Sequence, residues 1–216
     1  KRASQIRSAL FALRDSASIP FGTALNYALD VQKKTGVRPA FLLAILTQET
    51  NLGENVGQCL LTNFTTGAGV GKNTGTPFLD VMKPGRDVAP FLNLAERLGF
   101  DPKTKPVSCP QKGGYGGAMG PSQFIPSTWM GLEKRIAQLT GVTTPDPWIP
   151  RDAFFASALF LAELGADAGG YSAESTAAAK YYAGSGWKTR GKAYATSVMN
   201  HAQRIQENMI DPLQNL

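Results

Sequence analysis

The sequence is poor in the residues that hold metals or build thiol and imidazole catalysts. Its 216 residues include one histidine, His201, and two cysteines, Cys59 and Cys109. No Cys and His residues lie at the spacing of a zinc site, and no Asp-rich loop typical of a calcium site is visible. A Cys–His or Ser–His nucleophile is disfavoured for the same reason. We therefore expect no metal and no cofactor, and we assign His201 to the surface or the packing of the last helix.

Long apolar runs are also missing. No stretch approaches the roughly 20 apolar residues that span a bilayer, so we expect no transmembrane span in this chain. The composition, with 43% apolar and 18% charged residues, is ordinary for a globular domain. The chain begins at Lys1 without a methionine or a leader of basic and then apolar residues. This start is typical of an excised fragment or a mature form, and separately we expect a monomer or part of a larger exported protein.

The charge is positive but dispersed. Lys and Arg number 22 and Asp and Glu 16, and the net charge of +6 suits an anionic polymer such as nucleic acid, cell-wall glycan or a lipid surface. The basic residues form no dense block and no nucleic-acid motif, so no nucleic acid is expected as a partner. Gly67 to Asn73 looks like a phosphate-binding loop, but Thr66 and Asn73 stand where that motif needs Gly and Ser or Thr.

Helical periodicity dominates the chain and predicts a mainly α fold. Residues 58–80 are rich in Gly, Thr and Asn and show neither helical nor strand periodicity, and this predicts a long loop. The loop and the next helix, with Asp87 as its cap, predict a small inserted loop and helix subdomain at 58–112 within a single domain 1–216. The predicted helices cover residues 4–14, 23–34, 38–52, 87–98, 126–139, 152–164, 173–183 and about 190–210.

Cys59 and Cys109 lie near the two ends of this insertion. In an exported protein the two would be a plausible disulfide, worth about 4 kcal/mol by the chain-entropy relation for a loop of that length. Two buried free thiols are the competing interpretation.

Glu49 stands where its helix calls for an apolar residue. It follows Phe41, Leu42, Ile45 and Leu46 by eight, seven, four and three residues, so its carboxyl shares their face. Burial raises the pKa of a carboxyl and keeps it protonated near neutral pH, as a general acid requires. The alternative is a solvated side chain at the end of the helix, since most glutamates are exposed.

A glycine-rich stretch from Gly113 to Gly120 precedes Gln123. Glycines let the backbone approach a flat ligand, and a glutamine amide both donates and accepts hydrogen bonds. Sugars bind through such groups and stack on aromatic rings. A glycine-rich hairpin beside core aromatics is the simpler alternative. The candidate aromatics are Tyr115, Phe124, Tyr181 and Tyr182.

Three segments resemble, in order, motifs of the lytic murein transglycosylases, and they are most similar to the branch typified by membrane-bound lytic transglycosylase B. The segments are Glu49-Thr-Asn-Leu-Gly53, Gly117-Ala-Met-Gly-Pro-Ser-Gln-Phe-Ile-Pro-Ser-Thr-Trp129 and Tyr181-Tyr-Ala-Gly184. The match covers most of residues 38–205 apart from the insertion at 58–112. The resemblance implies a lysozyme-like α+β superfold that is mainly helical, and peptidoglycan glycan strands as the partner.

By this resemblance Glu49 is the single catalytic acid and base, Met119, Gly120 and Gln123 line the glycan cleft, and Tyr181 lies near the catalytic carboxyl. The family cleaves the bond between N-acetylmuramic acid and N-acetylglucosamine without water and leaves a 1,6-anhydro ring. One carboxyl serves both steps, unlike the two carboxylates of ordinary glycosidases. Such an enzyme acts outside the cytoplasm, in the periplasm, the cell wall or at the cell surface.

Two positions depart from the family pattern. Gly114 stands where relatives often place a serine that can orient the glutamate, and Tyr182 stands where an asparagine is common. These departures leave two alternatives open. One is a goose-type-lysozyme-like muramidase that uses water, and the other is a non-catalytic peptidoglycan-binding module that kept the cleft.

Overall fold

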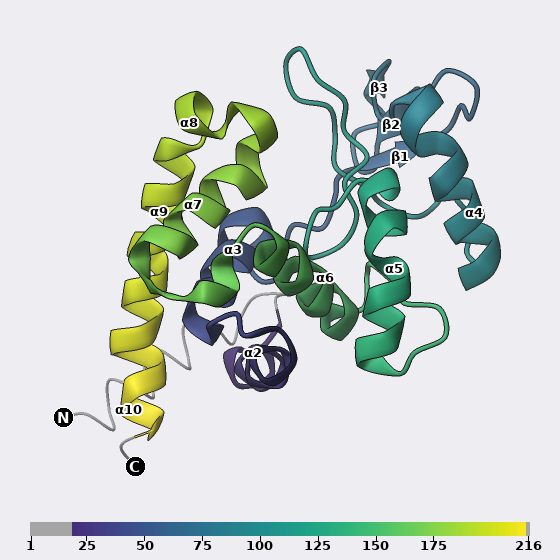
Figure 1. The fold of residues 1–216 in the computed structure, drawn as a ribbon. Helices are drawn as coiled ribbons and strands as arrows, with labels where there is room; N and C mark the ends of the chain where they lie inside the picture. The colour runs from purple at the N-terminus through teal and green to yellow at the C-terminus, as the bar shows by residue number, and fades with distance from the viewer. Residues whose placement is uncertain (1–18, 215–216) are drawn as a thin grey trace. The chain divides into compact units, whose positions relative to one another are not determined.

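The computed structural model describes residues 19–214, so the helix predicted at 4–14 lies outside the described residues. The chain divides into two compact units. We call residues 19–54 and 157–214 the helical unit and residues 55–156 the mixed unit. The fold is mainly helical, as predicted (Figure 1). No helix within the described residues is long and apolar enough to cross a membrane.

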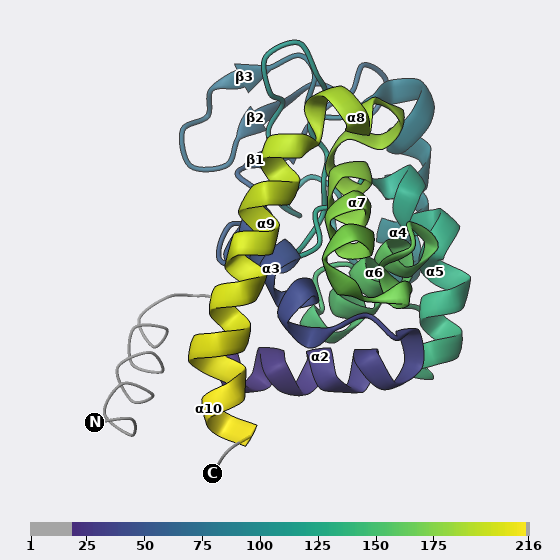
Figure 2. The same ribbon diagram turned by 60° about the vertical axis from the view of Figure 1, so that its left-hand side comes forward.

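The helical unit is built around one buried helix, α3 (Pro39–Thr50). All residues from Ala40 to Leu46 are fully buried, because the helix is apolar on every side rather than along one stripe. It packs against α2 (Phe21–Thr35) and α9 (Lys192–Ile205), and α9 also packs against α7 (Gly170–Ala183). Figure 2 shows α2 crossing below this group. The unit also contains the end of α6 (Pro150–Glu163), α8 (Trp187–Arg190) and α10 (Asp211–Gln214).

An ion pair fixes the start of α3. Arg38 donates from Nε and Nη2 to the two carboxylate oxygens of Glu174 in α7, at 2.8 and 2.6 Å. The Glu174 side chain is 1% exposed, whereas that of Arg38 is 35% exposed. A two-pronged contact of this kind sets geometry as well as charge. It joins the residue that precedes α3 to α7, the helix that carries Tyr181.

The mixed unit contains a small antiparallel sheet, so the prediction of a long loop at 58–80 was wrong. Its strands are β1 (Cys59–Leu61), β2 (Gly69–Gly71) and β3 (Pro77–Phe78), in that order. They are too short to show alternation of apolar and polar residues. Glycine, taken as a loop signal, is required here for close approach: a Cβ on Gly69 would lie 2.0 Å from the carbonyl oxygen of Leu60.

Cys59 and Cys109 form a disulfide, with their Cα atoms 5.0 Å apart. Cys59 also exchanges two backbone hydrogen bonds with Val107, at 3.0 and 2.9 Å. The bridge therefore attaches the segment before the glycine-rich stretch to the first strand of the sheet. The mixed unit holds the whole of 58–112 together with later helices. The insertion as a separate subdomain, and the single domain 1–216, stay predictions.

Asp87 does not cap the helix that follows it. That helix, α4 (Ala89–Leu98), begins after a π-helical turn at Pro84–Val88, and it has no side-chain cap. Asp87 is fully buried and pairs with Arg86, and its Oδ1 accepts from the backbone N–H and the hydroxyl of Ser127, at 3.2 and 2.6 Å. Ser127 lies in the first turn of α5 (Pro126–Thr140), so Asp87 caps a helix that begins about 40 residues later.

Candidate active site

Glu49 lies in the last turn of α3 and is half-buried. The helix ends one residue later, at Thr50, and the next residue, Asn51, adopts a left-handed conformation with φ of 51°. Burial raises the pKa of the Glu49 carboxyl, and a hydrogen bond from Tyr194 opposes the rise without cancelling it. A carboxyl with a raised pKa stays protonated at higher pH than a solvated one. The geometry thus suits an acid that donates a proton.

Tyr194 is the direct partner of Glu49. It comes from the first turn of α9, and its hydroxyl donates to Oε1 of Glu49. Burial, followed by the negative charge of Glu49, raises the pKa of Tyr194 far above its ordinary value. The phenol therefore remains protonated and acts only as a donor toward the carboxyl. It can stabilise the carboxylate that forms once Glu49 has given up its proton.

Tyr181 is the second phenol of this site. Burial is the main cause of its raised pKa, and the charge of Glu49 is the next. Its hydroxyl lies 3.3 Å from Oγ of Ser157, and its ring packs on Phe160 with centroids 5.5 Å apart. Both partners belong to α6. Two contacts from one helix hold the ring in place within the electrostatic reach of Glu49.

Tyr182 covers Tyr194 from the solvent side. Its ring is 60% exposed and stacks on the Tyr194 ring, with centroids 4.7 Å apart and planes 13° apart. Consecutive residues of a helix point about 100° apart, so Tyr181 and Tyr182 serve different parts of the site. The family asparagine that Tyr182 replaces would provide an amide, whereas Tyr182 provides an exposed aromatic face.

The pKa of Glu49 is set by its surroundings in the helical unit. Burial raises it and the hydrogen bond from Tyr194 lowers it, with burial the larger cause. Glu54 pairs with the side chain of Asn51. In the described residues no group of three or more His, Cys, Asp or Glu side chains lies together as metal ligands would. His201 is half-buried in α9, and burial lowers its pKa.

The other predicted site residues lie in the mixed unit, on the loop before α5. Met119 and Phe124 form an isolated antiparallel bridge, with the Met119 N–H donating to the Phe124 carbonyl at 3.0 Å. Both side chains are buried. Gln123 has φ of 52° and donates from Nε2 to the carbonyl of Gly120 at 2.9 Å. These residues therefore define the shape of a tight loop rather than a row of exposed side chains.

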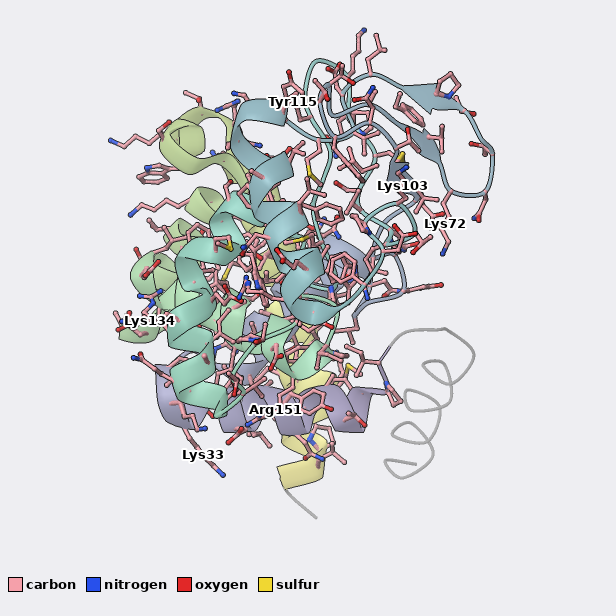
Figure 3. The ribbon with its side chains drawn as sticks, turned by 90° about the vertical axis from the view of Figure 1, so that its right-hand side faces the viewer. Lys33, Lys72, Lys103, Tyr115, Lys134 and Arg151 are labelled. Carbon is pink, nitrogen blue, oxygen red and sulfur yellow. A yellow bond between two sulfur atoms is a disulfide. The ribbon has the colours of Figure 1, made fainter. Side chains whose placement is uncertain are left out.

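Gly120 and Tyr115 differ sharply in their surroundings. A Cβ on Gly120 would lie 1.8 Å from the carbonyl oxygen of Pro147, and its φ is 58°, so only glycine fits. Tyr115 is 45% exposed, with the Lys83 ammonium 6.0 Å from its ring centroid. Figure 3 shows Tyr115 on a peripheral loop.

Gly114, one of the two departures from the family pattern, lies in open surroundings. A Cβ on Gly114 would meet only the carbonyl of Gln111, at 4.0 Å, so the family serine would fit there.

Tyr194 and Ser157 are the site residues that sequence reasoning missed. Tyr194 precedes Val198 by four residues and Ala202 by eight, so it continues the buried stripe of α9. A tyrosine on a buried stripe needs a partner for its hydroxyl, and this requirement was the available signal. Its partner lies 145 residues earlier in the chain, which no local pattern reveals.

Solved structures with the same fold include two from Escherichia coli. They are lytic transglycosylase SLT35 in complex with calcium and SLT35 in complex with bulgecin A, with TM-scores of 0.60 and 0.59. Each is 16% identical to this chain, and the alignments cover 96% of this chain and 76% or 75% of theirs. Soluble lytic transglycosylase SltB1 from Pseudomonas aeruginosa matches with a TM-score of 0.55, 17% identity and coverage of 83% and 74%. No curated protein matches.

These likenesses confirm the predicted lysozyme-like fold. The sequence itself matches the family model described as the transglycosylase SLT domain over residues 24–214, which is most of the chain. That range includes both units and all three motifs singled out in the sequence. The chain therefore belongs to the transglycosylase SLT domain family, and it is an enzyme of the lytic transglycosylase class.

Proposed function

We propose that this protein cleaves the β-1,4 bond between N-acetylmuramic acid and N-acetylglucosamine in peptidoglycan, with Glu49 as acid and then base. One observation carries the proposal. A half-buried carboxyl with a raised pKa has a phenol as its hydrogen-bond partner, so its protonated form is favoured and its charged form has a donor ready. This arrangement suits a single group that acts first as acid and then as base.

In the first step protonated Glu49 donates its proton to the glycosidic oxygen, and the bond from that oxygen to the muramyl C1 breaks. Glu49 is then a carboxylate, and Tyr194, already in contact, stabilises the charge. In the second step the carboxylate takes the proton of the muramyl C6 hydroxyl. The C6 oxygen then bonds to the muramyl C1. The products are a free 4-hydroxyl and a 1,6-anhydro ring, and Glu49 is protonated again.

The remaining residues have positioning roles in this proposal. Tyr181 lies within the electrostatic reach of Glu49 and is held by Ser157 and Phe160. Tyr182 offers an exposed ring on which a sugar can stack. Met119, Gly120, Gln123 and Phe124 shape the loop that, by family resemblance, lines the glycan cleft, and Tyr115 offers a further exposed ring. The proposed reaction uses no cofactor and no metal.

The substrate places the proposed enzyme outside the cytoplasm. Peptidoglycan is assembled into its mature strands in the periplasm or the cell wall, and the Cys59–Cys109 disulfide fits an oxidising compartment. We infer a monomer, or part of a larger exported protein, that acts on glycan strands there.

Digestion of purified sacculi in water enriched in ¹⁸O tests the reaction. Mass spectrometry should find muropeptides ending in anhydromuramic acid, which lack one water relative to reducing ends and carry no ¹⁸O at the new terminus. A muramidase would instead yield reducing muramic acid with ¹⁸O at C1, and this result would replace lytic cleavage by hydrolysis. Binding of strands without any soluble product would indicate the non-catalytic module.

A further inference from the structure

A three-residue segment of the predicted insertion, Val107-Ser108-Cys109, lies between the small sheet and the loop before α5. The chain returns from α4 to the edge strand β1 at this point, where Val107 and Cys59 form an isolated antiparallel bridge (Figure 1). We call this segment the brace. Its other neighbour is the loop of residues 117–124. We call that loop the cleft loop, because by family resemblance it lines the glycan cleft.

One buried residue holds the brace on both sides of Ser108. Val107 exchanges two backbone hydrogen bonds with Cys59, at 2.9 and 3.0 Å, and Cys109 is joined to Cys59 by the disulfide. Cys59 is fully buried in β1. Two hydrogen bonds alone would let so short an edge open locally, whereas the covalent bond closes a ring of chain around Ser108. Ser108 is therefore held in one place relative to the sheet.

Ser108 makes three hydrogen bonds to the first residues of the cleft loop. Its N–H donates to the Ala118 carbonyl at 2.8 Å, and its own carbonyl accepts from the Gly117 N–H at 3.0 Å. Its hydroxyl oxygen accepts from the Ala118 N–H at 2.9 Å, so a residue without a hydroxyl would leave that N–H without this acceptor. Together with a bond from the Gly116 N–H to the Asp80 carbonyl, at 3.0 Å, these contacts anchor the near end of the cleft loop.

The rest of the cleft loop closes on itself. The Met119 N–H donates to the Phe124 carbonyl at 3.0 Å. The Gln123 amide donates to the Gly120 carbonyl at 2.9 Å. At Gly120 the loop also approaches the backbone of Pro147, as the 1.8 Å between a Cβ at Gly120 and the Pro147 carbonyl oxygen shows. A loop that is closed on itself and anchored on two sides keeps one shape, and the brace supplies one of these anchors.

We propose that Ser108, held by the Cys59–Cys109 disulfide, is a positioning residue that sets the shape of the cleft loop and thereby the affinity for the glycan strand. This inference rests on the proposed function and gives the predicted insertion at 58–112 a role in it. The cleft loop binds sugars in the proposal, whereas Glu49 performs the chemistry. A disturbed brace therefore weakens binding of the substrate and its transition state alike, which raises KM and leaves kcat unchanged.

Removal of the Ser108 hydroxyl tests the brace without breaking the disulfide. In Ser108→Ala, KM for soluble glycan strands should rise about three- to tenfold, as expected for one lost hydrogen bond, and kcat should stay within about twofold of wild type. Thr104→Val is the matched control, because the exposed Thr104 hydroxyl bonds the Asp101 carbonyl at 3.0 Å on the same stretch of chain. The control should leave KM unchanged. An unchanged KM in Ser108→Ala, or an equal rise in the control, would overturn the inference.

Loss of the disulfide should have the larger effect. Cys59→Ala with Cys109→Ala should raise KM by about tenfold or more, again with little change in kcat. The bridge also stabilises the fold, so kinetics are measured at a temperature where circular dichroism shows the variant folded. If it does not fold, wild type reduced with dithiothreitol replaces it: the dithiol becomes a cyclic disulfide, and Cys59 and Cys109 gain two electrons and two protons as thiols. An unchanged KM in the folded protein without its bridge would contradict the proposal.

Amide hydrogen exchange distinguishes failure of this inference from failure of the proposed function, because it needs no turnover. In Ser108→Ala the Ala118 amide should exchange about tenfold faster, while the Ala44 and Ile45 amides of α3 keep their rates. Normal anhydro products with unchanged Ala118 exchange and unchanged KM would contradict the brace alone. Faster Ala118 exchange and weaker glycan binding, with no anhydro products even from wild type, would support the brace and contradict the proposed reaction.

Discussion

The two ends of α3 each place an ionisable side chain against a neighbouring helix, with opposite consequences. Just before the first turn, Arg38 neutralises the buried carboxylate of Glu174 through two hydrogen bonds. At the last turn, Glu49 accepts a hydrogen bond from the neutral hydroxyl of Tyr194, and burial raises the pKa of the Glu49 carboxyl. A cation makes a buried acid a structural element, whereas a phenol leaves it able to release and recover a proton.

The largest effect should follow from Glu49→Gln. The amide keeps the shape but is far too weak an acid to protonate the leaving oxygen, so release of anhydro products should fall by about a hundredfold to ten-thousandfold, the usual contribution of general acid–base catalysis. The thermal midpoint should change little. Glu54→Gln makes the same chemical change on an exposed residue five positions later and should leave activity intact. Retained activity in Glu49→Gln would disprove the assignment of the acid.

The next effect concerns the other end of the helix. Arg38→Met leaves the Glu174 carboxylate, whose side chain is 1% exposed, without its cation and should lower the free energy of unfolding by about 3–5 kcal/mol, as when one member of a buried pair is removed. Urea unfolding at pH 7 measures it. Arg38→Met combined with Glu174→Leu removes both charges and should recover most of the loss. If the double variant is no more stable than the single one, the pair does more than balance charge.

The smallest effect, and the sharpest test of the comparison, is Tyr194→Phe. Loss of a hydrogen bond to a charged group costs about 1.5–3 kcal/mol, so kcat should fall by roughly ten- to a hundredfold. The reaction needs protonated Glu49, so activity declines as pH rises through its raised pKa. Tyr194 lowers that pKa, and its removal should shift the decline to higher pH.

Tyr182→Phe is the matched control for this change. It keeps the ring that stacks on Tyr194 and alters only an exposed hydroxyl, so both kcat and the pH of the decline should stay close to wild type. If the activity of Tyr194→Phe declines at the same pH as that of the wild type, Tyr194 has only a packing role.

The parts of the fold that the sequence predicted are those with local causes. The helices around Glu49 and Tyr181 follow from apolar spacing, and Gly36 and Gly99 end helices in the left-handed conformation, as expected. The raised pKa of Glu49 follows from burial at the end of an apolar helix, which the apolar residues before Glu49 predict. Sequence reasoning reached these features because each depends on neighbours within about two turns.

The parts that it missed depend on distant residues. The short strands at Cys59 and Gly69 form through pairing, not through a pattern of their own. Tyr194 becomes a site residue only because the packing of α9 on α3 brings it to Glu49. Asp87 looked like a local cap because its sequence position allowed one, and the structure uses its carboxylate elsewhere. Long-range contacts decide such roles, and one sequence does not display them.

The contact between Asp87 and Ser127 limits how the mixed unit can be re-engineered. A shortened enzyme made by excising residues 58–112 would remove the carboxylate that satisfies the first turn of α5. The loss amounts to about 1 kcal/mol for the cap alone, and the start of α5 would also lose its buried neighbour. Residues 58–112 therefore cannot be removed without cost to α5. Any graft or deletion there must supply a new acceptor for the Ser127 N–H.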